Sequence, residues 1–173
     1  MKRLFTLDSW VMFILILLPI AFPGDILGLM LVFAYAFAII AWGYFLGVAL
    51  YSKLPGGHNL NLNKFKFFIV FPSVYYTVAV LITGGGYSIN SSNIDEYGPI
   101  AYLIIPLHLF SMFCIFYCMH FISKSLICAL TQNKNVQISE YIGYFFGLWF
   151  FPIGIWFIQP KIKRIFTDKI AST

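Results

Sequence analysis

The run from Ile26 to Tyr51 constrains this chain most, because it holds 26 residues and no charged side chain. A helix needs about 20 such residues to cross the hydrocarbon core of a bilayer. Of the 173 residues, 61% are hydrophobic and 10% are charged, whereas a soluble domain carries about 25% charged residues. The sequence therefore predicts an all-α integral membrane protein, a helical bundle that has the bilayer as its main solvent.

Four apolar runs are separated by turns or polar loops. The predicted transmembrane helices cover about residues 9–23, 26–51, 67–83 and 99–122. The loop 52–66 contains three lysines, whereas the loop 84–98 contains Asp95 and Glu96 and no basic residue. We interpret residues 1–173 as a single transmembrane domain, with the helix of the fourth span continuing through Lys124 to about Leu130.

The basic residues predict the orientation of these spans. With four spans and a cytoplasmic N-terminus, seven basic residues lie on the cytoplasmic side and the acidic residues of the loops lie outside. The seven are Lys2, Arg3, Lys53, Lys64, Lys66, Lys124 and Lys134. Because cytoplasmic loops of membrane proteins are enriched in Lys and Arg, we expect a multi-pass protein of the cell membrane with cytoplasmic N- and C-termini.

The segment 141–160 can be interpreted in two ways. Its 18 uncharged residues from Tyr141 to Ile158 would span about 27 Å as a helix, which is enough to cross a membrane. Crossing would place the four basic residues of the tail 161–173 outside, whereas entering and returning keeps all eleven basic residues of the chain inside. Pro152 and Gly154 favour a break in the helix at 151–154. Proline lacks a backbone N–H, and it disfavours a helical conformation of the preceding Phe151. We therefore favour a Pro/Gly-broken re-entrant or interfacial hairpin, with crossing as the alternative.

This broken segment is the first candidate functional region. Backbone groups freed by the break must be buried against protein or wetted, because lipid cannot satisfy them. Aromatic side chains near the break suit the headgroup level. The candidate residues of this elbow are Trp149, Pro152, Gly154, Trp156 and Gln159.

The second span carries small residues on one helical stripe, among them Ala36, Gly43 and Gly47. Gly43 and Gly47 form a GxxxG pattern, which allows helix backbones to approach closely. The pattern is common in membrane helices, so it predicts either packing within the chain or a homodimer face.

His108 is an ionisable residue inside the fourth predicted span. Such residues face a bundle interior or a water-filled cavity and often have a function. Tyr75 and Tyr76 of the third span are its expected polar neighbours, in a packed polar cluster or along a solute pathway. Cys114, Cys118 and nearby methionines could in principle hold Cu(I), but they also fill irregular gaps in helical bundles, and we expect no metal or cofactor.

The sequence contains no metalloprotease, nucleophile-elbow or phosphate-loop motif. The net charge of +5 is explained by the basic residues that set the orientation of the spans, so we expect no nucleic-acid partner. Our first hypothesis is a non-enzymatic packing or interaction subunit, whose partners are the bilayer and a second copy or another membrane protein. The alternatives are an oligomeric channel or transporter for an ion or neutral solute, and a membrane enzyme that uses His58 or His108.

The stretch Phe150–Trp156, continuing through Gln159-Pro160, resembles a C-terminal FFPIGIWxIQP signature of uncharacterised small bacterial polytopic membrane proteins. The match covers about 25 residues of the sequence, with Tyr141–Gly143 and Lys161-Ile162 agreeing as well. The resemblance implies the membrane class and a role for the elbow, and it implies no reaction.

Overall fold

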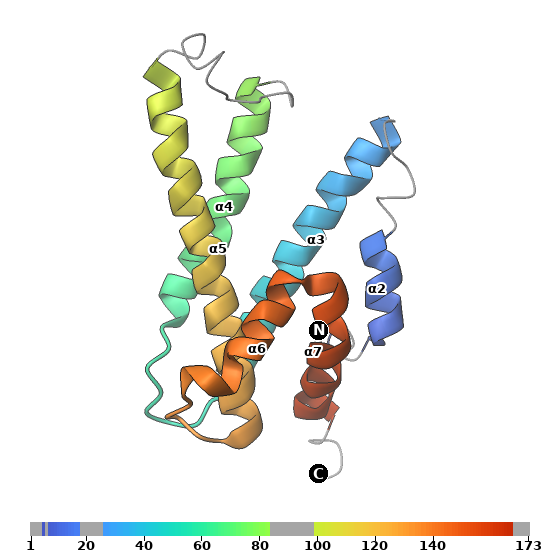
Figure 1. The fold of residues 1–173 in the computed structure, drawn as a ribbon, viewed down its shortest axis with the longest axis vertical. Coiled ribbons are helices and arrows are strands. Elements are labelled where there is room, and N and C mark those ends of the chain that lie inside the picture. The colour runs from blue at the N-terminus through green and yellow to red at the C-terminus, as the bar shows by residue number, and fades with distance from the viewer. Residues whose placement is uncertain (1–4, 6, 18–25, 84–98, 168–173) are drawn as a thin grey trace. The chain divides into compact units, whose positions relative to one another are not determined.

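The computed structural model describes residues 5, 7–17, 26–83 and 99–167, and all regular structure among them is helical. The all-α prediction is therefore confirmed for the described residues. Figure 1 shows the helices α2 (Ser9–Leu17), α3 (Ile26–Tyr51), α4 (Leu62–Thr83), α5 (Pro99–Thr131), α6 (Ile138–Trp149) and α7 (Phe151–Thr167).

The boundaries agree with the sequence where apolar runs and helices coincide. α3 has the predicted bounds, and α5 continues past the fourth predicted span to Thr131. α4 begins at Leu62, so the prediction that the loop lasts to Lys66 is wrong. Backbone hydrogen bonding does not stop where the apolar run stops, and lysine is a good helix former. Residues 18–23 of the first predicted span lie outside the described residues.

The chain divides into two compact units, residues 1–62 with 119–173, and residues 63–118. In the second unit, aromatic side chains join α4 to the first part of α5. The Phe68 ring lies 4.7 Å from Tyr117 and 5.9 Å from Phe113, and the Phe71 ring lies 4.8 Å from Phe110, all edge to face. Such ring pairs add roughly 0.5–1.5 kcal/mol each to the energy of burial.

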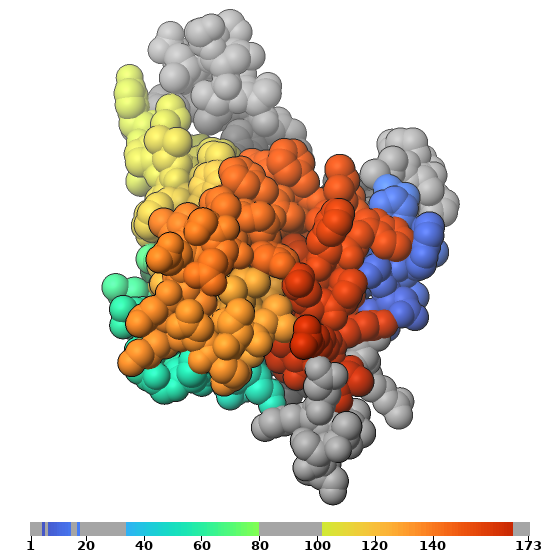
Figure 2. Space-filling view, turned by 60° about the horizontal axis from the view of Figure 1, so that its bottom comes forward, coloured from blue at the N-terminus to red at the C-terminus, as the bar shows by residue number. Residues whose placement is uncertain are grey.

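The first unit has the larger buried core. The largest fully buried side chains of its described residues come from α3, the end of α5 and α7, and they are Leu46, Leu50, Phe121, Leu126, Cys128, Ile155, Ile158, Gln159 and Ile162. The Trp42 ring of α3 lies 5.3 Å from Phe151 at the start of α7. Figure 2 shows α6 and α7 in contact on one face, with α2 beside α7. The core of this unit is therefore built jointly by α3, the end of α5 and α7.

Two helical stretches of the described residues are long and apolar enough to cross a membrane, Ala34–Tyr51 in α3 and Tyr102–Thr131 in α5. The core helix of a soluble protein can have the same length and composition, but it is mostly buried. Here only 28% of the first stretch and 17% of an apolar 18-residue window within the second are buried inside the protein. Large apolar side chains are exposed instead, including Phe37 at 72% and Tyr102 at 79%.

Candidate functional site: the C-terminal hairpin and the N-terminal strap

α6 and α7 form a helical hairpin that is broken at Phe150, where the backbone has φ −93° and ψ 54°. The Phe150 carbonyl accepts hydrogen bonds from the backbone N–H groups of Ile153 and Gly154, at 2.9 and 2.8 Å. A break was predicted at 151–154, and it lies one residue earlier. The expectation of a non-helical Phe151 is wrong, because Pro152 lies in the first turn of α7, where its missing N–H costs no helical hydrogen bond.

Two glycines let the arms of the hairpin touch backbone to backbone. A Cβ atom added at Gly154 would overlap the carbonyl group of Gly147. A Cβ at Gly147 would lie 3.1 Å from Cδ1 of Ile158. Gly147 and Gly154 lie at nearly equal distances along the chain from the break at Phe150. Once the position of the break is known, this spacing predicts that the two glycines face each other.

α6 begins at Ile138, before the predicted elbow, because its first turn is capped. The side chain of Glu140 accepts a hydrogen bond from the backbone N–H of Gln137 at 2.9 Å. The bond places this carboxylate at a helix N-terminus, where negative charge is favoured.

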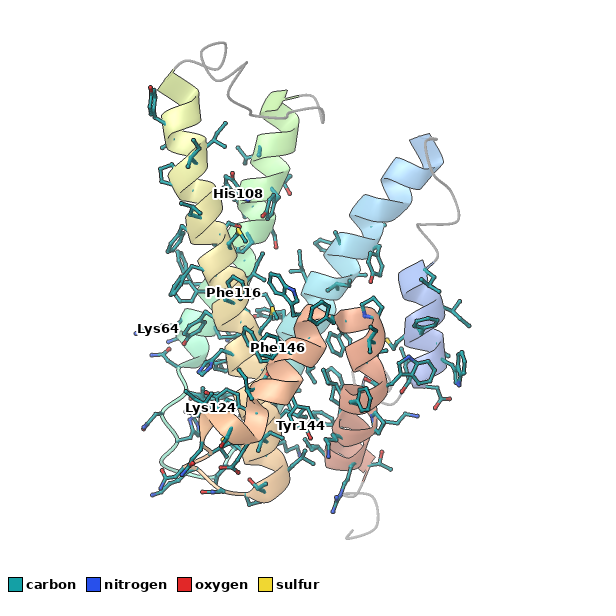
Figure 3. All side chains as sticks on the ribbon, viewed as in Figure 1. Lys64, His108, Phe116, Lys124, Tyr144 and Phe146 are labelled. Carbon is teal, nitrogen blue, oxygen red and sulfur yellow. The ribbon has the colours of Figure 1, made fainter. Side chains whose placement is uncertain are left out.

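The hairpin has a buried face and an exposed apolar face. On α7, Gly154, Ile155, Ile158, Gln159 and Ile162 are buried. The exposed apolar side chains on both arms are Ile138, Ile142, Phe146, Trp149, Phe150, Ile153 and Phe157, and Figure 3 labels Phe146 on α6. Water disfavours so many clustered aromatic and aliphatic side chains, so this face requires an apolar environment.

Gln159 is fully buried and ties the hairpin to the start of the chain. Its amide Nε2 donates hydrogen bonds to the carbonyl oxygens of Phe5 at 3.1 Å and Leu7 at 2.8 Å. These two acceptors fix the orientation of the amide, because a flipped side chain would direct Oε1 at two carbonyl oxygens. Oε1 is buried and has no hydrogen-bond partner among the described residues.

We call Phe5, Leu7 and Asp8 the N-terminal strap, since they lie along α7. Phe5 stacks on Phe166 with ring centroids 4.9 Å apart, and Asp8 forms an ion pair with Lys163. Sequence reasoning missed this strap, and neither partner of the ion pair carries a pattern that would have identified the other.

The start of α2 adds a second aromatic contact to α7. Trp10 packs edge to face against Trp156 at 4.5 Å, and Phe13 lies 5.8 Å from the same ring. Trp156 is half-buried in this contact, whereas Trp149 and Pro152 of the elbow are exposed. The five predicted elbow residues are therefore divided between both faces of the hairpin.

The predicted small-residue face of α3 is also divided. Gly43 and Gly47 are buried within the chain, whereas Ala36 is exposed. The two glycines therefore serve packing inside the protein, and the exposed small residues lie nearer the start of α3, together with Phe37.

The structure brings His108, labelled in Figure 3, together with the two tyrosines predicted to be its neighbours. The His108 ring lies 6.1 Å from the Tyr75 ring and 5.9 Å from the Tyr76 ring. The Tyr75 hydroxyl donates to the carbonyl of Ile104 at 3.4 Å. Among the described residues, no three His, Cys, Asp or Glu side chains are grouped as a metal site.

The three cysteines and the two other histidines lie outside the cluster at His108. Cys114, Cys118 and Cys128 are buried free thiols. The His58 ring lies 4.8 Å from Tyr51, and its Nδ1 accepts a hydrogen bond from the backbone N–H of Leu60 at 3.3 Å. His120 Nδ1 lies 3.3 Å from the Tyr141 hydroxyl.

In comparisons with protein-family models, with curated proteins and with solved structures, the chain matches none of them. The resemblance of its C-terminus to small bacterial membrane proteins therefore stays a prediction. The geometry of the hairpin and the N-terminal strap is the basis for the function proposed below.

Proposed function

We propose that the chain is a polytopic membrane protein with the four spans predicted above, and that the α6–α7 hairpin enters the cytoplasmic half of the bilayer and returns. The length of α6 supports this placement. Its 12 residues extend about 18 Å, whereas the hydrocarbon core is about 30 Å thick. The exposed apolar face of both arms then meets lipid, and the exposed side chains of α3 and α5 do the same.

The strap is the observation that carries this proposal. Phe5 and Asp8 lie against Phe166 and Lys163, so the beginning of the chain and the end of α7 lie together. If residues 141–158 crossed the bilayer after four other spans, the two ends would lie on opposite membrane surfaces. The contact therefore agrees with the orientation inferred from the basic residues, with both termini in the cytoplasm.

Within this membrane placement we propose a non-enzymatic packing or interaction subunit. On α3, small side chains are exposed next to the large side chain of Phe37. The small residues are Ala34, Ala36 and Ala38. Small residues let a second helix approach closely in lipid, where van der Waals packing drives association. The proposed partner is a second copy of the chain or another membrane protein.

Cysteine crosslinking in membranes tests the interaction role. In a background with Cys114, Cys118 and Cys128 replaced by Ala, Ala36→Cys on the exposed surface is expected to give a disulfide-linked dimer, or a crosslink to a co-purifying protein. The matched control is Gly47→Cys on the buried part of α3, which is expected to give neither. A chain that stays monomeric and purifies alone would contradict the proposal.

The cluster of His108, Tyr75 and Tyr76 favours a second candidate, an oligomeric channel or transporter for an ion or neutral solute. A polar cluster on otherwise apolar helices is where a solute path is expected. Flux into liposomes that disappears in His108→Phe would support it. Absence of flux in liposomes containing the unaltered protein would remove it.

A further inference from the structure

A cavity of about 500 Å³ lies where the turn after α3, the end of α5 and the end of α7 meet. Two cationic side chains line it, Lys53 from the turn and Arg164 from α7. Its apolar lining comes from Leu54, Ala129, Leu130 and Ile165. All of these residues belong to the first unit, and none of the described residues that line the cavity is acidic.

The walls of this cavity are held in place by Gln132. Its backbone lies in the left-handed region, with φ 53°, and its Nε2 donates to the carbonyl oxygen of Ala129 at 2.8 Å and to that of Lys53 at 3.4 Å. A non-glycine residue in this region is uncommon and marks a locally constrained backbone. The Gln132 side chain therefore gives a hydrogen-bond donor to a carbonyl group at the end of α5 and connects the turn at Lys53 to that helix end.

A second cavity, of about 450 Å³, is also lined by Arg164, together with Lys161, Tyr144 and Glu140. Lys161 Nζ lies 5.7 Å from the centre of the Tyr144 ring. The Glu140 carboxylate accepts the backbone hydrogen bond that starts α6. Arg164 thus lines both cavities, and the described residues of the two linings include three cationic side chains and one acidic side chain.

We propose that the cavity at Lys53 and Arg164 binds the phosphate group of an anionic phospholipid at the cytoplasmic membrane surface. A guanidinium presents a planar fork that matches phosphate oxygens, and a lysine adds a second charge-assisted contact. Basic pockets between membrane helices on the cytoplasmic side hold anionic headgroups in this way. The apolar lining beside the two cations suits the glycerol and upper acyl carbons of a lipid. The choice of a lipid source rests on the proposed membrane placement, whereas the phosphate chemistry rests on the lining residues.

The competing explanation is that these cations only balance helix ends. α3 and α5 both end at this cavity, and the carbonyl end of a helix carries partial negative charge that attracts Lys and Arg. That role stabilises the protein with or without a ligand. A stabilisation that appears only when phosphate lipid is added therefore separates the two explanations.

The test uses the full chain purified in a neutral maltoside detergent, with the melting temperature measured against added dioctanoyl phosphatidylglycerol. We expect a saturable rise that dioctanoyl phosphatidylcholine does not give. In Lys53→Gln/Arg164→Gln the half-saturating concentration is expected to increase at least about tenfold, because two charge-assisted contacts are lost. Lys66→Gln on α4 changes the charge outside the cavity and is expected to keep the wild-type response.

If the double variant does not fold, Lys53→Gln alone and the charge-conserving Lys53→Arg provide the comparison, since only the first should weaken the response. A rise that inorganic phosphate reproduces at the same concentration would support the phosphate site and assign it to a soluble ligand. No rise with phosphatidylglycerol, or an unchanged response in the cavity variants, would overturn the inference. Because the measurement is made in detergent, its failure is distinct from failure of the proposed topology or of the interaction role.

Discussion

The α6–α7 hairpin and the α4–α5 pair are both antiparallel helix pairs, but different atoms hold them together. In the hairpin, the backbones touch at Gly147 and Gly154, and no side chain separates them. In the α4–α5 pair, the contact is made by rings such as Phe68 against Tyr117 and Phe71 against Phe110. One interface leaves no room for an added atom, and the other is built from side chains that can shift.

The two pairs also use polar groups differently. The hairpin buries the Gln159 amide against two backbone carbonyls of the N-terminal strap. In the α4–α5 pair, the hydroxyl of Thr77 donates within its own helix to the carbonyl of Ser73 at 2.7 Å, and the bond from the Tyr75 hydroxyl across to the Ile104 carbonyl is long, at 3.4 Å. Polar bonds across elements specify one arrangement, whereas bonds within a helix do not. The hairpin should therefore be the less tolerant of substitution.

The largest effect is expected for Gly154→Ala. The added methyl group must push α6 and α7 apart at the Gly147 carbonyl, which we expect to cost about 3 kcal/mol or more, the upper part of the range for overpacking. Thermal unfolding in detergent, followed by tryptophan fluorescence, measures the loss.

Two neighbouring glycines provide graded controls for that change. In Gly147→Ala the only tight contact of the added methyl group is with the flexible end of Ile158, and the Gly154 Cα is at an ordinary 3.6 Å, so this change should cost less. A Cβ at Gly143 has no atom within 4 Å, so Gly143→Ala should gain roughly 0.5–1 kcal/mol from helix propensity. Equal effects at 143 and 154 would contradict the backbone contact.

The next largest effect is expected for Gln159→Leu. The change keeps the volume but removes both hydrogen bonds to the strap carbonyls, at a cost of about 1–3 kcal/mol if they stay buried. Hydrogen exchange should show faster exchange near Met12 and Phe13 at the start of α2. The near-isosteric Gln159→Glu should cost more at neutral pH, because it places a carboxylate against two carbonyl oxygens.

The Gln159→Glu loss should shrink as the pH falls. Burial raises the pKa of a carboxyl group, so the folded form of the variant binds a proton more readily than the unfolded form. Its stability therefore rises as the pH drops through the pKa of the folded form, and the gain is complete below the pKa of the unfolded form. A loss that does not depend on pH would show that the residue at 159 is solvated and would contradict the buried amide.

A smaller effect is expected for Phe68→Leu in the α4–α5 pair. The substitution removes edge-to-face contacts with several rings but leaves an apolar side chain, so we expect a loss of about 1 kcal/mol. The neighbouring rings can move into the space. A loss as large as that of Gly154→Ala would contradict the contrast between the two pairs.

The smallest effect is expected for Asp8→Asn, which removes the ion pair with Lys163. The Asp8 side chain is 75% exposed, and exposed ion pairs contribute about 0–1 kcal/mol. Melting temperatures compared in low and high salt check this value. The difference between variant and wild type should disappear as salt screens the pair.

Helix positions could be predicted from the sequence because apolar runs and turn residues are local signals. α3 has the predicted bounds, and the break of the C-terminal segment falls within one residue of the range marked by Pro152 and Gly154. The start of α4 could not be read from hydropathy, because its first turn is polar. Burial of Gly43 and Gly47 with exposure of Ala36 depends on which neighbours cover α3, and that information is not local.

The N-terminal strap was the least predictable part of the candidate site. The Gln159 amide reaches residues more than 150 positions away along the chain, and a single sequence carries no trace of such a pairing. His108 was different, because ionisable and phenolic groups inside apolar helices have few suitable partners. That scarcity explains why Tyr75 and Tyr76 could be named as its neighbours.

The central claim is that residues 138–167 enter the membrane and return, and labelling of a single cysteine tests it most directly. Thr167→Cys, at the end of α7, is placed in the chain with Cys114, Cys118 and Cys128 replaced by Ala, and intact cells are treated with a membrane-impermeant maleimide. Ser92→Cys in the loop 84–98 is the external reference and should be labelled in intact cells. The account predicts that Thr167→Cys is labelled only after the cells are opened. Labelling of Thr167→Cys in intact cells would contradict it and would show that the segment crosses.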